Sequence, residues 1–165
     1  MKKTVNNMLM AVVAILALTL SSCAKSDNSS TSVSPIMGQW QSTGEEGWIY
    51  NEDGDDVEMH YLIEDGWAYT WYYDETGHQT DSEEEEIVYE PGLLNIGANG
   101  TLTISNSEYE ETYDYVLKGN QIVLPEWGDE LIWHYSLENQ VLVIEEVAYY
   151  KGVMSTRILT TYQRK

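Results

Sequence analysis

The spacing of turn signals limits the fold of this chain more than any other feature. From Ile36 onward, no stretch keeps an apolar period near 3.6 for long enough to predict a helix. Short alternating segments are instead separated by turn residues about every 8 to 12 positions. The sequence therefore predicts an all-β fold of antiparallel strands, as a sandwich or a barrel, and the up-and-down order of its hairpins favours a barrel.

Asp65-Gly66 is the clearest of these turn signals and predicts a two-residue type I′ hairpin between segments 57–64 and 67–74. Pairing Glu64 with Trp67 fixes the register and separates two faces. The face expected in the core carries Val57, Met59, Tyr61, Ile63, Ala68, Thr70 and Tyr72. The amphipathic face carries Glu58, His60, Leu62, Glu64, Trp67, Tyr69, Trp71 and Tyr73.

The turn at 97–101 allows two registers, and packing decides between them. A two-residue Asn-Gly loop would set Ile96 opposite Thr103 and mix polar and apolar residues on both faces. A three-residue loop with Gly100 in a left-handed conformation pairs Ile96 with Leu102 instead. We therefore expect the three-residue loop.

Two later hairpins are predicted to turn at 119–120 and at 138–139, and the chain ends on an alternating strand over 155–164. The pairs expected across these turns are Leu117 with Ile122, Val116 with Val123, Tyr135 with Leu142, and Trp133 with Ile144. Each register keeps apolar and aromatic side chains on a shared face.

The N-terminus carries a different kind of signal. Lys2 and Lys3 precede an apolar run over 8–20, and Leu20-Ser21-Ser22-Cys23 follows. This layout is typical of a secretory signal, and the run is shorter than the roughly 20 apolar residues that a membrane-spanning helix needs. Cys23 is the only cysteine, so it has no intramolecular disulfide partner. The four residues resemble the lipobox of bacterial lipoproteins.

The lipobox resemblance implies that the signal peptide, residues 1–22, is removed, and that Cys23 carries diacylglycerol and a further acyl chain such as palmitate. Several acyl chains hold a protein stably on a bilayer. Residues 23–35 are Ser-rich and predict a flexible tether, which leaves 36–165 as one domain. In bacterial lipoproteins, an aspartate after the cysteine retains the protein at the inner membrane. Because Ala24 stands there in this chain, the resemblance implies a protein anchored in the outer membrane, on its periplasmic or its surface side. This covalent lipid is the only cofactor that we expect.

The mature chain is strongly acidic. Loss of residues 1–22 removes two of the eight basic residues and changes the formal charge from −20 to −22. Such a charge argues against nucleic acid or an anionic lipid surface as the partner. The acidic runs at 51–56 and 83–86 are expected to be solvated turns, and the first lacks the glycine and glutamate spacing of a calcium-binding EF-hand loop.

Four motifs along the domain carry a second resemblance, and they occur at 38–40, 98–101, 115–122 and 161–164. In this order they are similar to the lipocalin-like domains of small Gram-negative lipoproteins, over residues 35–165. In lipocalins the tryptophan of the first motif closes one end of the barrel beneath an arginine from the last strand region. The resemblance assigns the first role to Trp40 and the second to Arg164 or Arg157. The chain lacks the C-terminal helix, the disulfide pair and the middle motif of classical lipocalins.

The sequence shows no catalytic constellation. His60, His78 and His134 are too widely spaced to suggest a metal cluster, and a satisfied histidine on a half-buried face is the expected role of His60 and His134. No Gly-x-Ser-x-Gly elbow and no Gly-rich phosphate loop occurs. We therefore expect a protein that is not an enzyme.

Two main functions remain, beside the inhibition of a hydrolase by an acidic loop such as 83–86. The first is the binding of a small hydrophobic or amphipathic ligand inside the barrel. Its candidate contacts are Met59, Tyr61 and Tyr72. The second is a recognition or scaffold module with a filled barrel that contacts a glycan or an envelope protein through loops and an aromatic strand. Its candidate contacts are Trp67, Tyr69 and Trp71, which could instead be packed beneath a loop. The presence or absence of a cavity separates these two functions.

Overall fold

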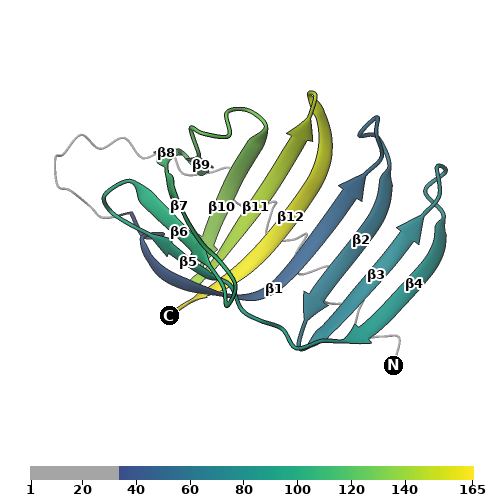
Figure 1. Ribbon diagram of the computed structural model, residues 1–165, viewed down its shortest axis with the longest axis horizontal. Coiled ribbons are helices and arrows are strands. Elements are labelled where there is room, and N and C mark those ends of the chain that lie inside the picture. The colour runs from purple at the N-terminus through teal and green to yellow at the C-terminus, as the bar shows by residue number, and fades with distance from the viewer. Residues whose placement is uncertain (1–33) are drawn as a thin grey trace. The chain divides into compact units, whose positions relative to one another are not determined.

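The computed structural model describes residues 34–165, and every regular element in this range is a β-strand (Figure 1). The strands are β1 (Gly38–Tyr50), β2 (Val57–Glu64), β3 (Trp67–Tyr73), β4 (Gln79–Glu86), β5 (Leu93–Ile96), β6 (Thr101–Ser105), β7 (Glu110–Asp114), β8 (Val116–Lys118), β9 (Gln121–Val123), β10 (Leu131–Glu138), β11 (Val141–Tyr150) and β12 (Val153–Arg164). All pairings are antiparallel, which confirms the all-β, antiparallel part of the prediction.

Three features of the sequence prediction concern residues at or before the start of this range. The signal peptide over 1–22 and the lipidation site at Cys23 lie outside the described residues, as does the tether over 23–35 except for its last two positions. Among residues 34–165, no helix has the length and apolar character needed to cross a membrane.

The strands form one branched sheet. Its main path runs β4-β3-β2-β1-β12-β11-β10-β9-β8, and β5, β6 and β7 branch from β1. Within the described residues the sheet does not close, because β4, β7 and β8 each have only one neighbour. The order also differs from the expected up-and-down barrel, since β4 is not beside β5.

The branch arises because β1 changes its partner along its length. Residues Gly38 to Gln41 pair with β5, and residues Glu45 to Tyr50 pair with β2, while β12 follows β1 on its other side. A β-bulge between Ser42 and Gly44 separates the two halves. A bulge adds an unpaired residue and can terminate a pairing, which here allows a second strand to replace the first.

Ser42 holds this branch point in place. Its backbone N–H donates to Gly92 O at 2.8 Å, and its Oγ accepts hydrogen bonds from Gly92 N at 2.7 Å and from the Tyr89 hydroxyl at 2.8 Å. Both partners belong to the connection between β4 and β5. The buried serine thus fixes where the chain leaves β4 and returns to the first half of β1.

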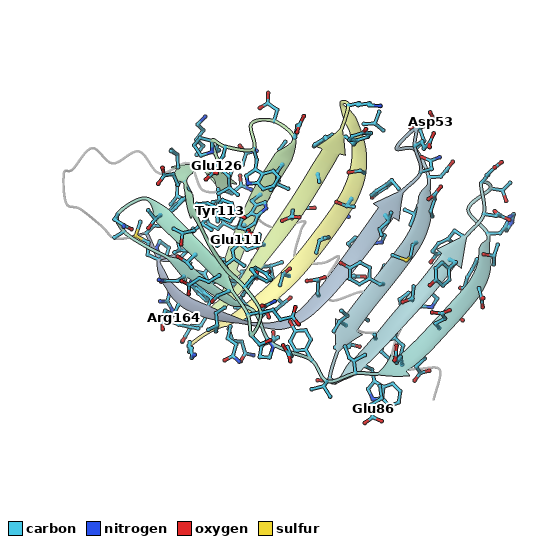
Figure 2. The ribbon with its side chains drawn as sticks, in the orientation of Figure 1. Asp53, Glu86, Glu111, Tyr113, Glu126 and Arg164 are labelled. Carbon is cyan, nitrogen blue, oxygen red and sulfur yellow. The ribbon has the colours of Figure 1, made fainter. Side chains whose placement is uncertain are left out.

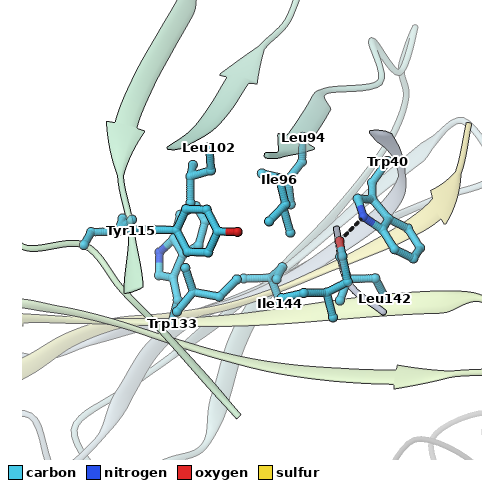
Figure 3. Packing of buried hydrophobic residues seen from close by; sticks show 11 residues of the cluster. Trp40, Leu94, Ile96, Leu102, Tyr115, Trp133, Leu142 and Ile144 are labelled. Atoms are coloured by element: carbon cyan, nitrogen blue, oxygen red, sulfur yellow. Dashed lines mark hydrogen bonds between the residues drawn. The ribbon is translucent and has the colours of Figure 1, made fainter. Parts of the chain in front are cut away.

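The hydrophobic core lies between β5 and β6 on one side and β9, β10 and β11 on the other (Figure 3). Eleven buried residues form it: Ile36, Trp40, Leu94, Ile96, Leu102, Tyr115, Ile122, Leu124, Trp133, Leu142 and Ile144. None of them belongs to β2, β3 or β4. Burial of these side chains supplies the main stabilising term of the fold.

Three predicted hairpins have the expected register. Across Asp65-Gly66, Glu64 pairs with Trp67, and both turn residues have positive φ angles of 51° and 81°. Gly100 has a φ of 83° and ends the three-residue loop. The other confirmed pairs are Ile96 with Leu102, Leu117 with Ile122, and Val116 with Val123.

The hairpin between β10 and β11 was predicted wrongly. It turns through Asn139 and Gln140, with φ angles of 49° and 67°, and not through 138–139. The pairs that form are Glu138 with Val141, Tyr135 with Ile144, and Trp133 with Glu146. Glutamine is an unusual residue for a left-handed turn position, so no turn signal marked this pair of residues. The shift of two residues leaves every side chain on its expected face.

The two acidic runs have different structures. Residues 51–56 form the expected exposed turn, closed by a hydrogen bond from Asn51 N to Asp56 O at 2.9 Å. Residues 83–86, which were also expected in a turn, belong to β4, whose eight residues are all exposed. A charged strand is tolerated at the edge of a sheet, where its charges face solvent and hinder pairing with another chain.

Trp40 and Arg164 lie together at one end of β1 and β12 (Figure 2 labels Arg164). Trp40 is fully buried, and its Nε1 donates to Ile36 O at 2.7 Å. The Arg164 guanidinium lies 4.4 Å from the centroid of the Trp40 ring and donates to Met37 O and Pro35 O at 3.1 and 2.7 Å. The pair therefore attaches the start of the domain to the sheet.

Replacing Arg164 with Met should lower the free energy of unfolding by about 1–2 kcal/mol, because a cation–π contact and two hydrogen bonds are lost while the aliphatic stem is kept. Urea denaturation of residues 24–165 measures this change. Lys165→Met is the matched control, since its side chain is exposed, and should change stability little. Equal stability of the two variants would contradict the anchoring role of Arg164.

Candidate functional site

Strands β2, β3 and β4 form a wing beside the second half of β1. Within the described residues, the extensive contacts of the wing are lateral, from β1 to β2, β2 to β3 and β3 to β4. In Figure 1, β1 runs from the region of β5–β7 to the wing, which no second layer covers. No residue of the wing is buried, although β2 and β3 are rich in apolar and aromatic side chains.

The six candidate contact residues all lie on the wing, but on two different faces. We define the inner face as the face of the sheet on which the core residues Trp133 and Ile144 lie, and the outer face as the opposite one. The inner face carries Met59, Tyr61 and Tyr72, and the outer face carries Trp67, Tyr69 and Trp71. The structure thus keeps the two predicted sets separate.

The inner face of the wing was expected in the core, and this prediction is wrong. Met59, Tyr61 and Tyr72 are half-buried and do not belong to the core cluster. The reason is the branch in the sheet. Because β5 pairs only with the first half of β1, the layer formed by β5 to β7 packs against β9 to β11 and leaves the wing uncovered (Figure 1).

A ladder of stacked rings crosses the outer face. The centroids of Trp48 and His60 are 5.0 Å apart at an angle of 4°, and those of His60 and Trp71 are 4.8 Å apart at 24°. Tyr69 extends the ladder at 6.2 Å from Trp71. The Arg157 guanidinium lies over the Trp48 ring, 5.0 Å from its centroid. Neighbouring members therefore cover much of one another's broad faces.

Two members of this outer ladder have carboxylate partners within the chain. His60 Nε2 lies 2.9 Å from Glu46 Oε1, and Arg157 Nε donates to Glu145 Oε1 at 2.6 Å. A sugar ring binds an aromatic platform through a free broad face, which the stacked rings do not offer between them. The ladder is best explained as a cross-strand support for the wing.

Trp48 and Arg157 were missed as members of this ladder. Trp48 lies in the second half of β1. The bulge between Ser42 and Gly44 interrupts the alternation of faces along this strand, so the face of Trp48 could not be read from the sequence. Arg157 was considered only as a partner for Trp40, whereas the structure gives that place to Arg164. Trp67 stays apart from the ladder and is 37% exposed at the other end of β3.

The carboxylates of the inner face have only neutral hydrogen-bond donors. Glu45 Oε1 accepts from the Tyr61 hydroxyl at 2.7 Å, and Glu146 Oε2 accepts from Trp133 Nε1 at 2.8 Å. On β4, Glu83 accepts from the Tyr72 hydroxyl at 3.4 Å. Tyr61 reaches Glu45 because Gly47, directly opposite it, has no side chain, and a Cβ there would lie 2.4 Å from the Tyr61 ring.

Burial changes the acidity of the groups around these carboxylates. It raises the pKa of Glu146, and the negative charge of Glu45 adds to the effect, while the hydrogen bond from Trp133 opposes it. Burial and the hydrogen bond to Glu45 raise the pKa of the Tyr61 phenol, and burial raises the pKa of Tyr162. Partial burial and neighbouring carboxylates cause these shifts, and no Lys or Arg of the described residues lies on this face of the wing.

A hollow of about 600 Å³ lies at the tip of the wing and is open to solvent. Its lining comes from the turn between β1 and β2 and the turn between β3 and β4, and includes Asp56, Glu58, Tyr72 and Asp74. Hydrogen bonds from Thr76 and His78 lower the pKa of Asp74, so this carboxylate stabilises the turn.

Across residues 34–165, no group of three or more His, Cys, Asp or Glu side chains is placed to hold a metal ion.

Comparison with known proteins does not supply a function. No protein-family model matches the chain, and no curated protein matches its sequence. The features of the described residues that bear on function are therefore the uncovered wing, its two faces and their charges.

Replacing Glu146 with Gln should stabilise the protein at neutral pH. The raised pKa means that the folded state binds this proton more tightly than the unfolded state does, so the carboxylate destabilises the fold above its folded pKa. The amide oxygen can still accept from Trp133. The gain should shrink as the pH falls through the folded pKa toward the ordinary value of 4.5.

Urea denaturation of the Glu146→Gln variant at several pH values tests this expectation. Glu138→Gln, an exposed position on the same hairpin, serves as the control and should behave like the unchanged protein at each pH. A gain that is independent of pH, or a loss of stability at neutral pH, would show that Glu146 is not a desolvated carboxylate.

Proposed function

We propose that this protein is a lipid-anchored, non-catalytic recognition module of the bacterial envelope, which holds a partner against the wing. One observation carries the proposal: the wing presents apolar and aromatic side chains on both faces, all of them at least partly exposed, and no described element lies over it in Figure 1. Uncovered surfaces of this kind are typical of interaction sites, because leaving them in water is unfavourable. A partner would bury them.

The filled core supports recognition over the transport of a small ligand. Eleven buried side chains occupy the space between β5 and β6 and β9 to β11. The candidate ligand contacts Met59, Tyr61 and Tyr72 lie on the open wing. A carrier of a small hydrophobic molecule needs an enclosed and largely apolar pocket, and the hollow at the wing tip is open and acidic.

We also propose that the part of the sheet outside the wing is related to lipocalin-like domains. Two observations support this relation. Arg164 lies over Trp40 near the start of the domain, and the four motifs occur in the same order along the chain. Recognition through the wing does not require the sheet to close into a barrel.

The resemblance of residues 20–23 to a lipobox supports the anchor, and Ala24 after the cysteine supports the outer membrane as its location. Replacing Cys23 with Ala should abolish palmitate labelling and leave a soluble or unprocessed protein, because the lipid is attached to this thiol. Cell fractionation and labelling measure both effects, and Ser22→Ala, which keeps a small residue in the lipobox, is the control. A Cys23→Ala variant that still labels and still sediments with membranes would refute the anchor.

Site-specific photo-crosslinking in cells tests the use of the wing. A photoreactive residue at Thr70 on the inner face or at Ser82 on the outer face should give a discrete adduct from at least one face. The same residue at Asn99 or Glu138, which lie in or beside turns outside the wing, should give none. Adducts from the control positions alone, or no adduct from either wing position, would contradict recognition by the wing.

A further inference from the structure

The two faces of the wing differ in how their charges are balanced. On the outer face, Glu46 lies against His60, and Glu145 lies against Arg157. Arg157 also covers the end of the ring ladder by lying over Trp48. On this face two carboxylates thus lie beside His60 and Arg157, and the stacked rings cover much of the aromatic surface, whereas Glu64, Glu84 and Glu86 lie on the same face with no salt bridge among the described residues.

The inner face of the wing carries no basic side chain, and no ring ladder covers its apolar surface. The described residues include five Lys and Arg, and none of them lies on the inner face of the wing. They are Lys118 on β8, Lys151 in the turn between β11 and β12, Arg157 on the outer face, and Arg164 and Lys165 at the end of the chain. The carboxylates of the inner face are left with the neutral donors Tyr61, Tyr72 and Trp133.

The register arranges the inner face as an apolar band between two acidic borders. The border on β4 consists of Asp81, Glu83 and Glu85. The band between the borders consists of Ile49, Met59, Tyr61, Ile63, Ala68, Thr70 and Tyr72. The border on the side of the core consists of Glu45 and Glu146. One face thus combines a surface that favours apolar contact with negative charge on two sides.

We propose that the inner face of the wing binds a cationic segment of a partner protein. Apolar side chains of that segment would pack on the band, and its Lys or Arg side chains would pair with the two acidic borders. This inference rests on the proposed function and adds the face that is used and the chemistry of the partner. Complementary charge also accelerates association with such a partner and excludes acidic ones.

Two other occupants fit the inner face less well. A second copy of this chain would bring its own acidic wing against the first, and like charges placed opposite each other are unfavourable. A glycan offers no positive charge to the borders, and the broad ring faces on which it would stack belong to the ladder on the other side of the sheet.

Strand β4 offers a matched pair of variants for a test. Glu83→Gln with Glu85→Gln removes two charges from the inner face, and Glu84→Gln with Glu86→Gln removes two from the outer face of the same exposed strand. The probe is a short labelled peptide that alternates Lys and Leu, and its binding to the full-length lipoprotein in non-ionic detergent is measured by fluorescence anisotropy. The double variant at Glu83 and Glu85 should weaken binding about three- to tenfold. The double variant at Glu84 and Glu86 should weaken it less than about twofold.

A peptide that alternates Glu and Leu should not bind, since its charges would repel both borders. Equal weakening by the two pairs of variants would overturn the assignment to the inner face, because it would reflect the total charge alone. Failure of the Lys-Leu peptide to bind, or a dimer of the free protein in sedimentation, would overturn the cationic partner. The crosslinks from Thr70 or Ser82 do not depend on this peptide. If they form while the peptide does not bind, recognition by the wing stands and only the cationic partner is refuted.

Discussion

The β-bulge at 42–44 is the constraint on which the rest of the structure depends. It lets a single strand, β1, pair with β5 over its first half and with β2 over its second half. Ser42 fixes this exchange through its hydrogen bonds to Gly92 and Tyr89. Without the bulge, β2 or β5 would follow β1 along its whole length, and either the core or the wing would be lost.

The branch divides stability and recognition between two parts of one sheet. The core side buries eleven residues and ties the start of the domain down through Trp40 and Arg164. The wing has no layer of its own, so it depends on strand pairing and on the cross-strand ladder from Arg157 to Tyr69. Because the outer face supplies that support, the inner face is left free for contact with a partner. The acidic edge strand β4 also hinders pairing between copies of the chain.

Local signals in the sequence predicted the hairpins well, because turn chemistry and the two-residue period fix both the register and the faces. The sequence could not predict which strands meet across long separations, such as β1 with β5 and β12, or the turn at Asn139-Gln140. The candidate site shows the same limit. Alternation placed Met59, Tyr61 and Tyr72 on one face, but whether that face is covered depends on the bulge, which no turn signal marks.

The central claim is that the wing is an uncovered extension whose stability is separate from that of the core, and native-state amide hydrogen exchange of residues 24–165 tests it most directly. Amides of β5, β6 and β9 to β11 should exchange only through global unfolding, whereas those of β3 and β4 should exchange through local opening at a lower free energy. Protection of β3 and β4 equal to that of the core strands would contradict the account, because it would mean that the wing is held by contacts as extensive as those of the core.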